Sequence, residues 1–177
     1  MWTRPQRFST LVLVILEQQV SLASAYAAYK KLKEKTGIIT PQKIMAMDDD
    51  ALRSCYLSRQ KMIYVRELAT AIQNKKLRLP QLAQMTDDEV REQLTQIKGI
   101  GTWTADVYLM QSLQRTDVFP LGDLALVNSI KEVKGLPAGT PKEHLLELGE
   151  AYRPHRTIAS MIYWHAYIKK RNIKLGD

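Results

Sequence analysis

The sequence contains a single cysteine and no long apolar run, and each shortage excludes a class of protein. One cysteine, Cys55, permits no disulfide within the chain and no multi-cysteine zinc or iron–sulfur site. We interpret Cys55 as a small buried hydrophobe rather than as a nucleophile. The apolar run at 11–16 is followed directly by Glu17 and is too short to span a bilayer. It predicts the start of a buried helix rather than a membrane anchor or a signal peptide.

Positive charge is what the chain has in excess. Among its 177 residues, 26 are lysine or arginine and 18 are aspartate or glutamate, so the formal net charge is +8. A basic surplus favours a polyanionic partner, which means nucleic acid or an anionic membrane surface. The chain is also long enough to bury a substantial core without disulfides or metals.

The hydrophobic pattern is helical almost throughout, and no segment alternates with the period of two that a half-buried strand would show. Phe8, Leu11 and Ile15 lie on one apolar stripe and predict a first helix. Gly37 predicts the end of the next helical stretch. Later helices are predicted over 58–73, from about 102 to 111 and from about 156 to 170. We therefore predict an all-α fold.

Capping signals mark several helix starts. Thr86 and Glu89 have the spacing of a capping box, in which each side chain accepts from the other residue's amide. Thr40 followed by Pro41 predicts an N-cap and a first helical residue. The segment 140–143, Thr-Pro-Lys-Glu, predicts a second capping box with proline at the first helical position.

A Lys-Gly-Ile-Gly turn separates two of the predicted helices. The amides of Gly99, Gly101 and Thr102 would face outward at the start of the second helix, where unpaired amides and the helix dipole attract anions. A DNA phosphate fits such a site, and Lys98 adds charge beside it. The plainer alternative is a tight turn between helices with a glycine C-cap. Asp106, early in the second helix, is expected only to complement the helix dipole.

The string LxxIxGIGxWTA at 94–105 resembles the helix-hairpin-helix of DNA repair glycosylases. Asp123 comes twenty residues after Trp103 and ends a stretch, DVFPLGD, that resembles the Gly/Pro-rich loop and aspartate of the HhH-GPD superfamily. Segments 8–21 and 152–164 resemble the family's opening and closing helices. The resemblance covers essentially the whole chain and is closest to the 3-methyladenine DNA glycosylase II (AlkA-like) type.

The resemblance implies a two-lobed helical HhH-GPD fold with the hairpin and the aspartate lining a cleft. We expect a central lobe of about 25–113, with the hairpin at 94–111, and a second lobe from the N-terminal helix plus about 115–177. The chain has no room for the extra β-rich domain of AlkA-like enzymes, and its single cysteine excludes the iron–sulfur cluster of other branches, so no cofactor is expected. Trp103 occupies the position of the Schiff-base lysine in bifunctional branches, which implies no lyase activity.

Asp123 is the predicted catalytic carboxylate. Hydrolysis of an N-glycosidic bond builds oxocarbenium charge on the sugar, and a carboxylate stabilises that charge and positions water. Ordinary glycosidases need a second carboxyl to protonate the leaving group, but an alkylated base is already cationic and leaves as a neutral molecule. A plain helix N-cap is the alternative role, and the two roles are compatible. We expect a monofunctional DNA glycosylase that removes 3-methyladenine-like bases in base excision repair.

The damaged base must leave the duplex and enter an aromatic pocket. Trp103 and Trp164 match pocket positions of the resembling family, and indole faces attract cationic bases. Tyr108 is a weaker pocket candidate, for which a place in the core is the preferred interpretation. Gln19 matches the family's wedge, which fills the gap left by the extruded base. The alternative for Gln19 is an exposed glutamine at a helix end.

The remaining predicted contacts with DNA come from the same segments. The full predicted set is Gln18, Gln19, Ser21, Arg59, Lys61, Lys98, Gly99, Gly101 and Thr102. Arg59 and Lys61 would contact phosphates, or would merely belong to a solvated face. The resemblance also implies a structural monovalent cation in the hairpin, held by the backbone carbonyls of Thr95, Ile97 and Gly99.

The expected partner is double-stranded DNA containing a damaged base, and we expect a monomer with no membrane association. In a bacterium the protein would be cytoplasmic and nucleoid-associated. Three alternatives stay open. The first is a non-catalytic helix-hairpin-helix protein, which would need neither Asp123 nor a pocket. The others are a glycosylase for another damaged or mismatched base and an unrelated basic helical interaction protein.

Overall fold

The computed structural model describes residues 3–173, and every regular element within that range is helical. The predicted all-α class is therefore confirmed. The elements are α1 (Phe8–Glu17), α2 (Leu22–Thr36), α3 (Pro41–Ala46), α4 (Asp49–Arg53), α5 (Arg59–Gln73), the 3₁₀ helix η1 (Leu79–Gln84), α6 (Asp87–Thr95), α7 (Thr102–Gln111), α8 (Leu124–Lys134), α9 (Lys142–Glu150) and α10 (Arg156–Lys170).

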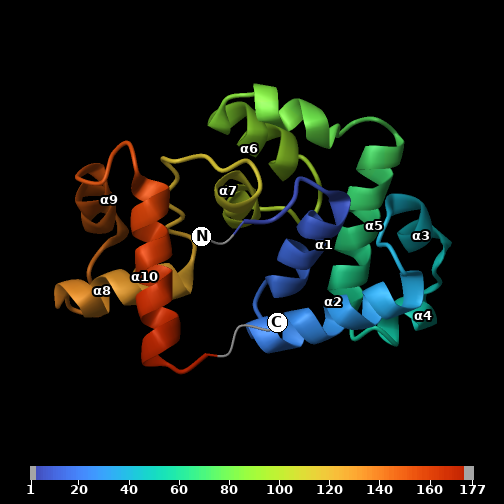
Figure 1. Cartoon of the computed structure of the whole chain (residues 1–177), viewed down its shortest axis with the longest axis horizontal. Helices are drawn as coiled ribbons and strands as arrows, with labels where there is room; N and C mark the ends of the chain where they lie inside the picture. The colour runs from blue at the N-terminus through green and yellow to red at the C-terminus, as the bar shows by residue number, and fades with distance from the viewer. Residues whose placement is uncertain (1–2, 174–177) are drawn as a thin grey trace.

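The helices form two groups, with α8, α9 and α10 on one side of the molecule and α1 to α5 on the other (Figure 1). Helix α1 is buried along most of its length and packs against α2, α5 and α7. The expected place of this N-terminal helix in the second lobe is therefore wrong. Its apolar stripe, with Leu11 and Ile15 fully buried, is covered by helices of the central lobe instead.

Local sequence signals explain most helix starts. Thr40 caps α3 by accepting from the Lys43 amide, and Thr86 forms the expected reciprocal capping box with Glu89. The box predicted at 140–143 is wrong. Pro141 is itself the N-cap of α9 in an extended conformation, so Thr140 lies outside the helix and its hydroxyl donates to the Pro137 carbonyl.

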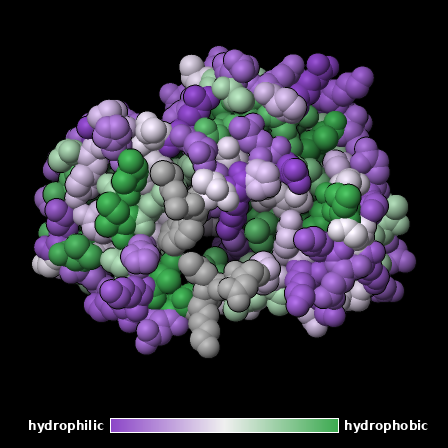
Figure 2. All heavy atoms as spheres, in the orientation of Figure 1, coloured by the Kyte–Doolittle hydropathy of each residue, from purple (hydrophilic) through white to green (hydrophobic). Residues whose placement is uncertain are grey.

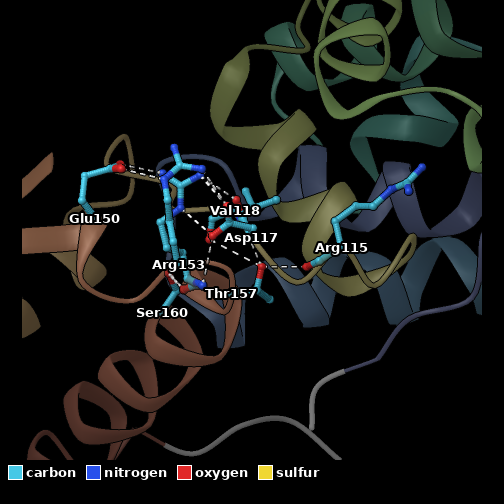
Figure 3. Close-up of polar contacts among 8 residues, drawn as sticks. Arg115, Asp117, Val118, Glu150, Arg153, Thr157 and Ser160 are labelled. Atoms are coloured by element: carbon cyan, nitrogen blue, oxygen red, sulfur yellow. Dashed lines mark hydrogen bonds and ion pairs between the residues drawn. The ribbon is translucent and has the colours of Figure 1, made fainter.

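A polar network attaches the segment between α7 and α8 to the start of α10 (Figure 3). The Asp117 carboxylate accepts from Arg153 at 2.9 Å and from Arg156 at 2.7 Å. The Thr157 hydroxyl donates to the Arg115 carbonyl at 2.7 Å and accepts from the Val118 amide at 3.0 Å. These contacts fix the start of the segment that leads to Asp123, the N-cap of α8.

This network makes a pH-dependent contribution to stability that Asp117→Asn should remove. The hydrogen bonds from Arg156 hold the pKa of the Asp117 carboxyl below its usual value. A carboxyl with a depressed folded-state pKa stabilises the fold above its unfolded pKa of about 4, and this contribution is lost as the pH falls through the folded value. We expect the variant to melt about 2–4 °C lower at pH 7. The difference between the two melting temperatures should shrink progressively as the pH is lowered below about 4. A difference that stays constant over this acid range would contradict this assignment.

The described surface is polar over much of the face in Figure 2, which is hollowed between the two groups of helices. None of the helices between residues 3 and 173 is both long enough and apolar enough to cross a membrane.

Candidate active site

Asp123 lies at the N-terminus of α8, where the chain turns out of the Pro120–Gly122 segment. Its backbone amide donates to the Pro120 carbonyl at 2.9 Å, and its side chain caps α8 by accepting from the Leu126 amide at 2.8 Å. The expected capping role is therefore present. Asp123 as a whole is partly buried, so it is not sealed inside the core.

Two indoles donate to this carboxylate, one to each oxygen. Trp103, on α7, donates from Nε1 to Oδ2 at 2.8 Å. Trp164, on α10, donates from Nε1 to Oδ1 at 3.1 Å. Asp123 thus joins the hairpin helix to the closing helix. Because Oδ1 accepts two of the three N–H groups and Oδ2 accepts one, Oδ2 keeps a lone pair for a further contact. This double indole contact was not predicted from the sequence.

The three aromatic residues predicted for the base pocket differ in how deeply they are buried. Trp103 is half-buried and Trp164 is 7% exposed, and both meet the edge of the site through their indole N–H groups. Tyr108 is fully buried within the hydrophobic core. The burial of its phenol also raises the pKa of Tyr108 to about 12. Its assignment to the base pocket is wrong, because a side chain with no exposed surface cannot contact an extruded base.

The hairpin between α6 and α7 depends on Gly99. This residue has φ +94°, which disfavours any side chain, and a Cβ there would lie 2.1 Å from Cγ of Tyr64 on α5. Gly101 is the N-cap of α7 and supplies no side-chain cap, so the first amides of that helix have no cap acceptor. Such amides, together with the helix dipole, form the kind of anion site that the sequence predicted.

Gly99→Ala should therefore destabilise the hairpin. Positive φ and the overlap with Tyr64 together should lower the free energy of unfolding by about 2–4 kcal/mol. Chemical denaturation measures this directly, and Gly139→Ala is the matched control, because a Cβ at Gly139 meets no atom within 4 Å. A Gly99→Ala variant as stable as the control would show that the turn does not need glycine.

A buried ion pair joins the two hairpin helices. Arg91 on α6 donates from Nε to Asp106 on α7 at 2.8 Å, and Asp106 is 8% exposed. Burial raises the pKa of the Asp106 carboxyl, and the bond from Arg91 opposes that rise. The expectation that Asp106 only complements the helix dipole is wrong, since its carboxylate pairs across the hairpin.

Two residues predicted to contact DNA form hydrogen bonds within the protein instead. The Gln18 amide donates to the Gly99 carbonyl at 2.8 Å and to the Thr104 hydroxyl at 3.0 Å. The Lys61 ammonium donates to the Leu16 carbonyl at the end of α1, and its burial lowers the pKa of Lys61. Both side chains hold α1 in place, so neither is a free phosphate or base contact, and Lys61 is not the merely solvated residue of the alternative either.

The other predicted DNA contacts are at the surface. The exposed members of the set are Gln19, Ser21, Arg59, Lys98, Gly101 and Thr102. Gln19 has φ +57° and projects from the turn between α1 and α2, and Ser21 caps α2 by accepting from the Ser24 amide. Their contacts with DNA stay predictions.

The carbonyls suggested for a monovalent cation are partly engaged. The Ile97 carbonyl accepts from the Ile100 amide at 3.0 Å, and the Gly99 carbonyl accepts from Gln18. Each carbonyl oxygen has a second lone pair, so these hydrogen bonds do not exclude a cation, and the site stays a prediction. Across residues 3–173, no cluster of histidine, cysteine, aspartate and glutamate has the arrangement of a metal site.

Residues 12–154 match the family described as the HhH-GPD superfamily base excision DNA repair protein. DNA-3-methyladenine glycosylase 1 of Schizosaccharomyces pombe is 30% identical over 165 residues, which are 91% of this chain and 72% of that protein. The putative DNA-3-methyladenine glycosylase YfjP of Bacillus subtilis is 29% identical over 90% of this chain, and the match spans 58% of YfjP.

Two solved structures share the fold. The DNA-3-methyladenine glycosidase of Bacillus halodurans superposes with a TM-score of 0.81 at 33% identity, covering 98% of this chain and 81% of that one. The S. pombe 3-methyladenine DNA glycosylase Mag1, in complex with abasic DNA, superposes with a TM-score of 0.88 at 28% identity, covering 100% and 87%. Because the family match covers residues 12–154, which are most of this chain, the chain belongs to the HhH-GPD superfamily of base excision DNA repair proteins.

Proposed function

We propose that the protein is a monofunctional DNA glycosylase that hydrolyses the N-glycosidic bond of alkylated, 3-methyladenine-like bases in double-stranded DNA. The observation that carries this proposal is the Asp123 carboxylate held between the indoles of Trp103 and Trp164, beside the hairpin. The names of the DNA-3-methyladenine glycosylase relatives and the abasic-DNA complex of one of them support it.

The chemistry follows from the free lone pair on Oδ2 of Asp123. In the proposed complex, C1′ of the extruded nucleotide lies near this oxygen and the base lies against the indoles. The bond between C1′ and the base nitrogen breaks with its electron pair passing to the base, which cancels the positive charge of the alkylated ring. The carboxylate stabilises the oxocarbenium ion that remains. Water then adds to C1′ and loses a proton, which leaves an abasic sugar and a neutral free base.

A cationic base is favoured over a neutral one by the partners of Asp123. Its hydrogen-bond partners in the described chain are two indoles and one backbone amide. All three are donors of N–H groups that do not ionise at neutral pH, so none of them is an acid that could protonate a departing neutral base. Neutral oxidised bases should therefore be poor substrates.

The proposed DNA interface combines the hairpin with the α1–α2 turn. The α7 amides at Gly101 and Thr102 would bind a phosphate, with Lys98 adjacent, while Gln19 would enter the duplex. A monovalent cation on the hairpin carbonyls would add positive charge near the same phosphate. In a bacterial cell such a protein would act on nucleoid DNA.

The experiment that tests the proposal is base release from defined duplexes. Duplexes with one methylated purine, one 8-oxoguanine or one mismatch are incubated with the protein, and the released base is measured by chromatography. We expect time-dependent release from the methylated duplex and little from the others. Tight binding with no release from any duplex would instead indicate a non-catalytic DNA-binding protein.

We further propose that the protein lacks lyase activity, because Trp103 offers no amine to attack C1′. Borohydride reduces a Schiff base to a stable covalent link, so it should trap no protein–DNA adduct during base release. A trapped adduct would show that a lysine elsewhere in the chain forms the Schiff base.

A further inference from the structure

We propose that Gln18 is a positioning residue that fixes the Gln19 wedge relative to the phosphate-binding hairpin, so that the two act on DNA as one rigid body. This inference rests on the proposed glycosylase function, because the wedge and the hairpin are assigned by it. It gives Gln18 a role different from the direct DNA contact expected from the sequence.

The link is a single amide group that bridges distant parts of the chain. Gln18 ends α1, and its Nε2 donates to the Gly99 carbonyl at 2.8 Å and to the Thr104 hydroxyl at 3.0 Å, across 81 and 86 positions of sequence. An amide nitrogen has two hydrogens, so both are used by the hairpin. Thr104 is 1% exposed, which places one end of the link inside the protein.

The next residue is held in an unusual conformation. Gln19 has φ +57°, a left-handed backbone that is uncommon for a residue other than glycine. Such a conformation persists when its surroundings hold it in place. Here Gln18 anchors one side of the turn, and Ser21 anchors the other side by capping α2. The direction in which the exposed Gln19 side chain points therefore depends on the Gln18 contacts.

Other contacts hold the end of α1 independently of Gln18. The Lys61 ammonium donates to the Leu16 carbonyl, and Glu17 pairs with Arg4 in a two-bond contact at 2.6 and 2.8 Å. Loss of the Gln18 amide should therefore free the wedge from the hairpin without unfolding α1. A stable variant with a specific defect is thus attainable.

A rigid link matters because extrusion needs work on the DNA. Unstacking a base costs a few kcal/mol, which the protein must supply through its contacts. If the hairpin holds a phosphate and the wedge is free to shift, the wedge can recede instead of entering the stack. A base that is already unpaired needs no such work, so the link should affect only paired lesions.

The test compares one variant on two substrates. Gln18→Met keeps the length of the side chain and removes both hydrogen bonds. We expect single-turnover release of a methylated purine to fall about tenfold from duplex DNA, the loss that about one to two hydrogen bonds would produce. Release from the same sequence as a single strand should change less than about twofold. Gln42→Met, at an exposed position of α3, is the matched control and should leave both rates unchanged.

A double variant shows whether the loss of rate in Gln18→Met arises through Gln19. If Gln18 acts through the wedge, Gln18→Met added to Gln19→Ala should cost nothing further on duplex DNA. Additive losses would overturn the proposal in favour of a direct DNA contact by Gln18. Equal losses on both substrates together with a lower melting temperature would overturn it in favour of a purely structural role.

Extrusion is also measured without chemistry, which separates this inference from the proposed function. The fluorescence of 2-aminopurine at the target position rises when the base unstacks, and the rise should be slower with Gln18→Met than with the wild-type protein. If the wild-type protein releases no base but still shows this difference, the glycosylase proposal fails and the link stands. If the two proteins extrude 2-aminopurine equally fast, the link is wrong whatever the release assay shows.

Discussion

Asp123→Asn is expected to lower the single-turnover rate of base release by about a thousandfold. The substitution removes the negative charge that stabilises the oxocarbenium ion and leaves the size of the side chain unchanged. Asparagine also caps helices, so it can still accept from the Leu126 amide and maintain the start of α8. Binding to DNA should stay close to that of the wild-type protein, because the hairpin and the wedge are untouched.

The matched control is Asp48→Asn, which makes the same chemical change at another helix N-cap. Asp48 is exposed and accepts from the Ala51 amide at 2.7 Å at the start of α4. This variant should release base at the wild-type rate. If Asp123→Asn kept most of its activity, or if Asp48→Asn lost as much, the carboxylate could not be the group that faces the sugar.

Helix termini were the part of the fold most open to prediction, because capping is local. Thr86 and Glu89 are three residues apart and satisfy each other's contacts without any other part of the chain. Gly37 ends α2 with φ +70°, a conformation that few other residues adopt. Thr140 misled because Thr-Pro-Lys-Glu has the residues of a capping box at the right spacing, although the helix starts one residue later than that box requires, with Pro141 as its N-cap.

Contacts between distant segments were the part that the sequence could not supply. An amphipathic stripe shows that α1 buries one face, but it carries no information about which helices cover that face. The same limit applies to Gln18, whose partners come 81 and 86 positions later. Tyr108 and Trp103 both follow the hairpin glycines, and only the packing of α7 buries the first and leaves the second at the site.

The ion pair between Arg91 and Asp106 was not predicted, although the sequence contains a pattern that indicates it. Arg91 lies four residues before the end of α6 at Thr95, and Asp106 lies four residues after the start of α7 at Thr102, so an antiparallel pair of helices brings them side by side. A buried aspartate seldom stays ionised without a partner. Pairing opposite charges at equal distances from the two ends of the connecting segment 96–101 would have predicted this ion pair.

Removal of the indole N–H groups should be the second large effect on the chemistry. Trp103→Phe and Trp164→Phe each keep an aromatic face for the base and delete one donor to Asp123. A hydrogen bond to a charged group contributes about 1.5–3 kcal/mol. If that contribution is made in the transition state, the rate of base release should fall about ten- to a hundredfold for each variant. The concentration of DNA needed for half-maximal rate should change little, because the stacking surface remains.

The alternative is that the indoles contribute only as walls for the base, and two comparisons separate the roles. Trp103→Ala removes the ring as well as the donor, so a further loss in that variant measures the ring alone. In an Asp123→Asn background the negative charge is gone, so Trp103→Phe should then cost almost nothing. If Trp103→Phe costs the same with and without the carboxylate, its N–H does not act through Asp123. The contact would then be a feature of the free protein only, and catalysis would depend on the carboxylate and the ring separately.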